Sequence, residues 1–199
     1  MTTSEQYVKK LLHDKYDVDL IKIEETNRKS PDYKCYSDAK LICVAELKDI
    51  EYYPPTEETG WKIERLNGVQ FASRKDNAPN RVARLIHSAF KQLKEFKPPR
   101  VLIFLNRDSR VDVKDLHEAF EGTHVYSNGN LSYVNRESKR IANGKIKHEK
   151  YLIDLYIWIE EGKPKMGSDD KIFLGHPTQI GKDLAHQYFS QRTWPKDPR

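Results

Sequence analysis

The chain lacks most of what would build a cross-linked, zinc-stapled or membrane-spanning protein. Cys35 and Cys43 are the only cysteines among 199 residues, too few for a disulfide framework or a four-ligand zinc site. No stretch approaches the roughly 18 uncharged residues that span a bilayer, and the amino terminus, MTTSEQYVKK, has no apolar run behind a basic start. We therefore expect a soluble, cytoplasmic protein without a membrane partner.

Two common catalytic signatures are also missing. The seven histidines show no metal-ligand spacing such as HExxH, and the nine glycines form no glycine-rich phosphate loop. These absences argue against a zinc protease and against nucleotide triphosphate hydrolysis.

Basic charge is present in excess and is unevenly distributed. The formal net charge is +5, and segment 136–150 alone carries six bases and two acids. Such a segment suits a polyanion, although a solvated lysine-rich hairpin is an equally ordinary interpretation.

The hydrophobic pattern predicts an α/β protein. It indicates a helix over 3–16, then strands over 18–23, 31–36 and 41–47 that form a meander. An amphipathic helix with apolar positions from Val82 to Phe96 and a buried strand over 100–106 complete an αβββαβ order. Between them, 51–80 is a long excursion or small subdomain.

The remainder of the chain predicts further α and β elements. Asp112 is placed to cap a helix that ends at Gly122, and Asn143-Gly144 is a hairpin signal. A strand over 151–159 and a helix over 179–189 follow. We expect one domain over 1–199, with a core of about 3–106 and a carboxyl-terminal elaboration over 107–199 that could bind nucleic acid.

Two charged residues stand inside the third predicted strand. Because alternate side chains of a strand share a face, Glu46 and Lys48 are neighbours about 7 Å apart, on the opposite face from Cys43. A three-residue loop at 38–40 would place Asp32 opposite Glu46. The same register pairs Cys35 with Cys43, which we interpret as small core residues.

Opposed carboxylates repel, so we expect a cation between Asp32 and Glu46. A hard divalent ion such as Mg²⁺ prefers oxygen ligands and keeps waters that a substrate can replace. Lys48 beside it could stabilise charge on a phosphate or help to orient or activate the attacking water. The three residues together suggest metal-assisted hydrolysis of a phosphodiester.

These residues carry a resemblance to a known family. Pro31-Asp32, a gap of thirteen residues and then Glu46-Leu47-Lys48 resembles the PD-(D/E)xK signature of the restriction-endonuclease-like nuclease superfamily. The αβββαβ order is similar to the core of that family, in which helices flank a central mixed sheet. The resemblance covers roughly 5–106, and 51–80 and the residues after Asn106 lie outside it.

The resemblance implies a role for each motif residue. Asp32 and Glu46 would bind Mg²⁺ or Mn²⁺, and the backbone carbonyl of Leu47 would add a ligand. Lys48 would be the catalytic base or an electrostatic stabiliser. The alternative is that Lys48 forms an ordinary cross-strand ion pair with Asp32 or Glu46.

Two further residues have less direct claims. Similar nucleases often carry an acidic metal-site residue at the position of Glu5, yet Thr2-Thr3-Ser4-Glu5 also fits a helix capping box. Gln92-Leu93-Lys94-Glu95-Phe96 resembles the Gln-x-x-x-Tyr element of RecB-like nucleases, with Phe96 in place of tyrosine. The alternative is that Gln92 is a plain residue on the flank of the helix, with no role in a site.

The expected function is a divalent-metal-dependent nuclease acting on DNA. Specificity would come from loops, with 51–80 as the first candidate. The alternatives are a catalytically inactive nucleic-acid-binding module on the same fold and a protein-interaction factor. A homodimer would suit the cutting of both strands of a duplex, although no residue indicates it.

The expected nucleic-acid contacts are Arg81, Arg84, Lys91, Gln92, Arg136, Lys139, Arg140, Lys145 and Lys147.

Overall fold

The computed structural model describes most of the chain in separate stretches. These stretches are residues 2–24, 30–52, 62–66, 69–73, 78–97, 99–121, 124–127, 132–135, 146, 149–161 and 170–189. Their elements are α1 (Thr3–Tyr16), β1 (Asp19–Lys22), β2 (Tyr33–Ser37), β3 (Lys40–Ile50), β4 (Lys62–Leu66), β5 (Val69–Ser73), α2 (Ala78–Leu93), β6 (Arg100–Asn106), α3 (Val113–Glu121), β7 (His124–Ser127), β8 (Ser132–Asn135), the short helix η2 (Glu149–Tyr151), β9 (Leu155–Glu160), β10 (Lys171–Gly175) and α4 (Gln179–Tyr188).

The centre of the molecule is a six-stranded mixed sheet with the order β1-β2-β3-β6-β9-β10. β3, β6 and β9 run parallel to one another, whereas β1, β2 and β10 pair antiparallel with their neighbours. The parallel step from β3 to β6 requires a crossover, which α2 supplies. The expected α/β class and mixed central sheet are confirmed.

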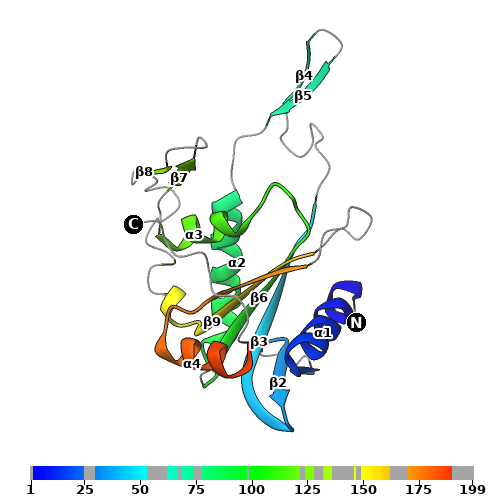
Figure 1. Cartoon of the computed structure of the whole chain (residues 1–199), viewed down its shortest axis with the longest axis vertical. Coiled ribbons are helices and arrows are strands. Elements are labelled where there is room, and N and C mark those ends of the chain that lie inside the picture. The colour runs from blue at the N-terminus through cyan, green and yellow to red at the C-terminus, as the bar shows by residue number, and fades with distance from the viewer. Residues whose placement is uncertain are drawn as a thin grey trace.

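Helices cover both faces of this sheet (Figure 1). α1 and α4 pack on one face, where Val8, Leu12 and Leu184 meet Ile103 and Ile157. On the other face, α2 and α3 pack against side chains that alternate with these along the strands. The residues of that second core include Val82, Ile86, Leu93, Leu116, Leu102, Phe104 and Trp158. The three-layer arrangement follows from strands whose two faces are both apolar.

The predicted helices at the start and end of the chain are confirmed within one residue, as is the strand over 100–106. Asp112 accepts bonds from the backbone N–H of Lys114 and Asp115 and caps α3 as expected. β10 and the two separate hairpins, β4–β5 and β7–β8, were not predicted. In Figure 1 the β4–β5 hairpin stands apart from the main sheet. Asn143-Gly144 lies outside the described residues.

The β2–β3 hairpin reaches the predicted register by a different route. Cys35 faces Cys43 and Tyr33 faces Ala45, as expected, but the loop has two residues and Ser37 pairs with Lys40. The predicted three-residue loop is therefore wrong. Asp38 and Ala39 form the loop, and both adopt positive φ, at 50° and 61°. A β-bulge between Cys35 and Tyr36 then shifts the pairing by one residue, so that the strands have the predicted register from Cys35 back to Tyr33.

No helix within the described stretches is long and apolar enough to cross a membrane.

Candidate active site

Asp32, Glu46 and Lys48 meet where β2 begins beside the middle of β3. Asp32 immediately precedes β2, and Glu46 and Lys48 are alternate residues of β3. Their neighbours Ala45 and Leu47 face the core under α1, so Glu46 and Lys48 face the α2 side of the sheet. The bulged hairpin thus brings together three residues that are up to sixteen positions apart in the sequence.

Hydrogen bonds hold these residues in fixed orientations. The Nζ of Lys48 donates to Oε1 of Glu46 at 2.6 Å, and the backbone N–H of Asp32 donates to Oε2 of Glu46 at 3.2 Å. In return, the N–H of Leu47 donates to Oδ2 of Asp32 at 2.9 Å. Each carboxylate therefore accepts a backbone N–H from the other strand segment, which locks the register at this point.

Glu46 is an unusual residue for the interior because its carboxyl group is only 1% exposed. The pKa of Glu46 is raised to about 7, chiefly by burial and to a smaller extent by the charge of Asp32, although the hydrogen bond and charge of Lys48 and the backbone N–H of Asp32 lower it. Because burial destabilises the ionised form of Glu46, an additional cation nearby would stabilise it. Lys48 alone does not fully offset its burial.

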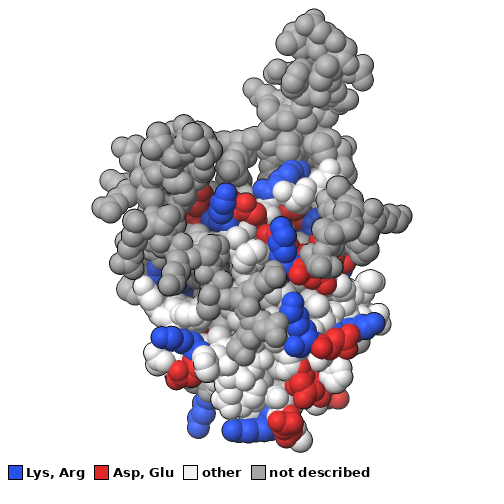
Figure 2. Space-filling model, in the orientation of Figure 1, with Lys and Arg blue, Asp and Glu red and all other residues white. Residues whose placement is uncertain are grey.

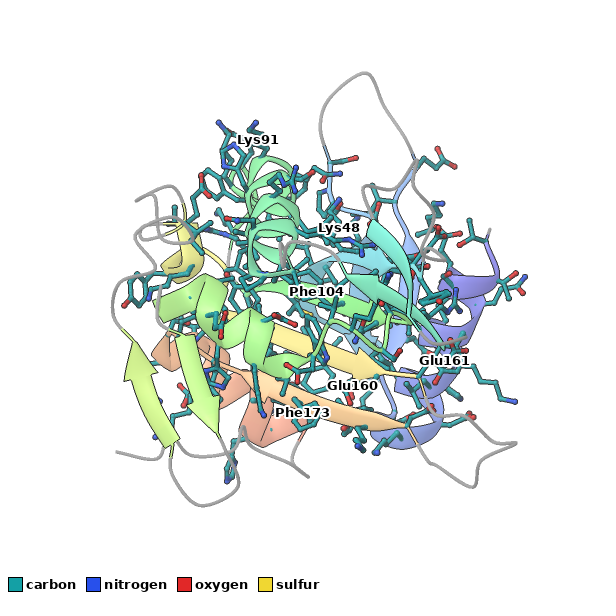
Figure 3. All side chains as sticks on the ribbon, turned by 90° about the horizontal axis from the view of Figure 1, so that it is seen from above. Lys48, Lys91, Phe104, Glu160, Glu161 and Phe173 are labelled. Carbon is teal, nitrogen blue, oxygen red and sulfur yellow. The ribbon has the colours of Figure 1, made fainter. Side chains whose placement is uncertain are left out.

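The crossover helix supplies the fourth residue. Nζ of Lys48 also donates to Oε1 of Gln92 on α2, at 3.1 Å, so the ammonium lies between Glu46 and Gln92. The expectation that Gln92 belongs to this neighbourhood is supported by a direct contact with Lys48. Figure 3 shows Lys48 beside α2 and Lys91 on the outer side of the same helix.

The donor set fits a divalent cation that takes oxygen ligands. Asp32 and Glu46 each retain lone pairs beyond their hydrogen bonds, and Mg²⁺ needs only one or two carboxylates when waters and phosphate oxygens complete its shell. The N–H and C=O of one strand residue point toward the same neighbouring strand, so the carbonyl of Leu47 is directed to the side of Asp32. Among the described residues, no three His, Cys, Asp or Glu side chains gather around one point, so an all-protein cage is not formed.

Glu5 makes two other interactions. Its Oε2 accepts the N–H of Thr2 at 2.6 Å, and Thr2 accepts the N–H of Glu5, which is the capping box considered from the sequence. Its Oε1 bonds the Nζ of Lys22 at 2.7 Å. These bonds, with Lys22 the strongest, lower the pKa of Glu5 to about 2. The structure does not bring Glu5 into a three-acid group with Asp32 and Glu46.

The expected nucleic-acid contacts separate into three groups. The guanidinium of Arg81 is bonded within the protein, to Asp108 at 3.3 Å and to the carbonyl of Glu51 at 3.0 Å, so it ties α2 to the ends of β3 and β6. Arg84 and Lys91 are exposed on α2. Arg136, Lys139, Arg140, Lys145 and Lys147 lie outside the described residues.

Asp108 is a buried acid that the sequence analysis did not identify. It is 2% exposed and bonds both Arg81 and Arg110. Burial would raise its pKa, but the bonds and charge of Arg110 prevail and lower it. The sequence signal that could have identified Asp108 is its position two residues after the buried strand β6. Its pairing with Arg81 had no local signal, because the two residues are 27 positions apart.

The cysteines can also be compared with the expectation. Cys35 and Cys43 are both buried and unbridged in the core under α1, as expected. His87 of α2 is half-exposed, and its Nδ1 lies 2.6 Å from Oε1 of Glu149. That pair joins α2 to η2 on the flank of the helix opposite Gln92.

Comparisons with protein-family models, with curated proteins and with solved structures found no match in any of the three.

Proposed function

We propose that the protein is a divalent-metal-dependent nuclease that hydrolyses phosphodiester bonds in nucleic acid, with a restriction-endonuclease-like core of the PD-(D/E)xK type. The observation that carries the proposal is the meeting of Asp32, Glu46 and Lys48 at one point of the sheet, with Glu46 buried. A buried carboxylate with a raised pKa beside a second acid and a lysine supports a functional site, because burial and like charges raise the pKa of acids in many active sites.

Each residue has a role that follows from its position. Asp32 and Glu46 would hold Mg²⁺ or Mn²⁺, with the carbonyl of Leu47 as an additional ligand. The bound metal would neutralise charge on the phosphate and lower the pKa of a coordinated water. Lys48, held by Glu46 and Gln92, would stabilise the negative charge that develops as water attacks phosphorus and the leaving oxygen departs.

The order of the elements supports the same proposal. α1, the β1–β2–β3 meander, the crossover helix α2 and the parallel strand β6 follow one another with the motif on β2 and β3. The β4–β5 hairpin is an insertion between β3 and α2. β9, β10 and α4 then extend the same sheet and its cover beyond that core.

Cleavage of DNA and RNA tests the proposal directly. Supercoiled plasmid, linear duplex, single-stranded DNA and RNA are incubated with Mg²⁺ or Mn²⁺ and with wild type, Lys48→Ala or Asp32→Asn. Removing a group that stabilises transition-state charge costs about 10²–10³ in rate, so both variants should lose at least that much. Lys182→Ala and Asp14→Asn, which alter exposed residues of α4 and α1, are charge-matched controls.

The outcomes separate the competing functions. Metal-dependent cleavage by wild type and both controls, lost in both site variants, would establish the nuclease. Salt-sensitive binding without cleavage of any substrate would favour an inactive nucleic-acid-binding module. Activity that survives both substitutions would show that the site is elsewhere.

A further inference from the structure

The outer face of α2 is the one long helical surface in the described structure that carries cations without acids. Its sixteen residues, APNRVARLIHSAFKQL, contain two arginines, a lysine and a histidine but no aspartate or glutamate. By contrast α1, α3 and α4 each contain at least one acid. In Figure 2 basic and acidic side chains lie interspersed over the described part of the displayed face.

Helical periodicity divides α2 into three stripes. The buried stripe comprises Val82, Ile86, Ala89 and Leu93. Arg84, Ser88 and Lys91 lie on the opposite, exposed stripe, at intervals of one helical turn. Gln92 is beside Lys91 on the flank that meets Lys48. Lys91, the last cation of the exposed stripe, is therefore one residue from Gln92, which contacts Lys48 in the candidate active site.

From this continuity we infer that the exposed stripe of Arg84, Ser88 and Lys91 binds the backbone phosphates of the substrate strand next to the bond that is cut. The inference rests on the proposed function, because that function places the bond that is cut beside Lys48. A strand of nucleic acid is the occupant because its evenly spaced negative charges complement a stripe of cations without acids. Arg81 is not included in the stripe, since its guanidinium already bonds Asp108 and the carbonyl of Glu51.

The length of the stripe sets the length of strand that it contacts. Arg84 and Lys91 are seven residues apart, which is about 10 Å along a helix axis. At a rise of about 3.4 Å per nucleotide in one strand, that distance spans about three nucleotides. The stripe therefore contacts phosphates on one side of the cut only, and carries no base-specific information.

Binding in the absence of metal is the first test, because it does not depend on cleavage. Wild type, an Arg84→Ala/Lys91→Ala double variant and a Lys171→Ala/Lys182→Ala control are titrated with fluorescent DNA and RNA in EDTA, from 50 to 200 mM salt. The control removes two exposed cations from β10 and α4, away from α2. Loss of two phosphate contacts should reduce the slope of log affinity against log salt by about 1.8 for duplex and about 1.4 for single strands.

The result that overturns the inference is equally specific. A slope that is unchanged in the α2 variant, or reduced as much in the control, would show that the stripe makes no particular phosphate contact. Tighter binding of an acidic protein than of nucleic acid would identify the wrong occupant. Each of these outcomes is independent of whether the wild type cleaves.

Phosphate replacement then tests the connection between the stripe and the site. Single neutral methylphosphonate linkages are placed at successive positions on each side of the cut, and cleavage is measured for wild type and the α2 variant. Interference should occur within about three nucleotides on one side and should disappear in the α2 variant, since the contact is already lost. Interference that is identical in the two proteins would overturn the placement, and absence of any cleavage would instead overturn the proposed function.

Discussion

The two faces of β3 show how one strand serves a core and a site. On the α1 side, Cys43 and Ala45 are buried among apolar residues, and their burial contributes to folding without an electrostatic penalty. On the α2 side, Val44 is apolar but Glu46 and Lys48 place charges in the same layer. The core face stabilises the fold, whereas the site face keeps a buried carboxylate at a cost in stability, which the proposed metal-binding role would explain.

The largest expected effect comes from the core face. Ile103 of β6 pairs with Leu47 in the ladder, is 1% exposed and packs in the core under α1. Ile103→Ala should lower the free energy of unfolding by about 2–5 kcal/mol, because a buried side chain is replaced by a cavity. Urea unfolding measures it, with Ile21→Ala as the control because Ile21 is 55% exposed. Equal losses in the two variants would contradict the assignment of the core.

On the site face, removing a charge should stabilise the protein. The pKa of Glu46 is about 7 in the folded chain, compared with an ordinary value of 4.5, so the folded state keeps a proton that the unfolded state releases between these values. Stability of the wild type therefore falls as pH rises across that window. Glu46→Gln should abolish this loss and stabilise the protein at pH 8 by up to about 3 kcal/mol.

Thermal unfolding of Glu46→Gln at a series of pH values measures this effect. The gain should be nearly absent near pH 4.5 and complete above pH 7, and cleavage should be lost. Glu95→Gln is the control because Glu95 is exposed and should show no such pH dependence. A Glu46→Gln variant that is less stable than wild type at pH 8 would mean that the Lys48 contact outweighs burial.

A smaller effect should follow from Gln92→Ala. The change removes one hydrogen bond to the ammonium of Lys48 while leaving Glu46 in place. A bond to a charged group contributes about 1.5 kcal/mol, so kcat should fall about tenfold, with KM little changed. Single-turnover cleavage measures the rate, and Gln92→Glu, which restores an acceptor oxygen, should recover part of it. A change confined to KM would assign Gln92 to substrate binding instead.

The smallest expected effect is at the hairpin turn that joins the two strands of the site. Ala39 has φ of 61°, a conformation that disfavours a residue with a Cβ atom. Ala39→Gly should therefore stabilise the chain by about 0.5–1 kcal/mol, as measured by urea unfolding, with cleavage unchanged. Lys40→Gly, at the first residue of β3, should instead destabilise the chain.

The register of the site could be predicted from the sequence because alternation and hairpin pairing are local rules. The turn could not, since Asp38-Ala39 lacks the glycine that usually marks a two-residue loop, and the bulge has no sequence signal of its own. The ion pair between Arg81 and Asp108 could not be predicted either, because Asp108 becomes a neighbour of Arg81 only after β6 pairs with β3. Long-range ion pairs of this kind depend on tertiary structure.

The bulge between Cys35 and Tyr36 limits how the length of the chain can vary between the two acids. A single insertion or deletion between Asp32 and Cys35 would turn Asp32 to the α1 face, away from Glu46, because strand residues alternate. Two added residues at the turn would preserve the facing, as would one residue absorbed by a second bulge. Where no bulge compensates, changes in length within the paired segments should therefore occur in pairs, so that the spacing of the acids is constrained by parity rather than by absolute distance along the chain.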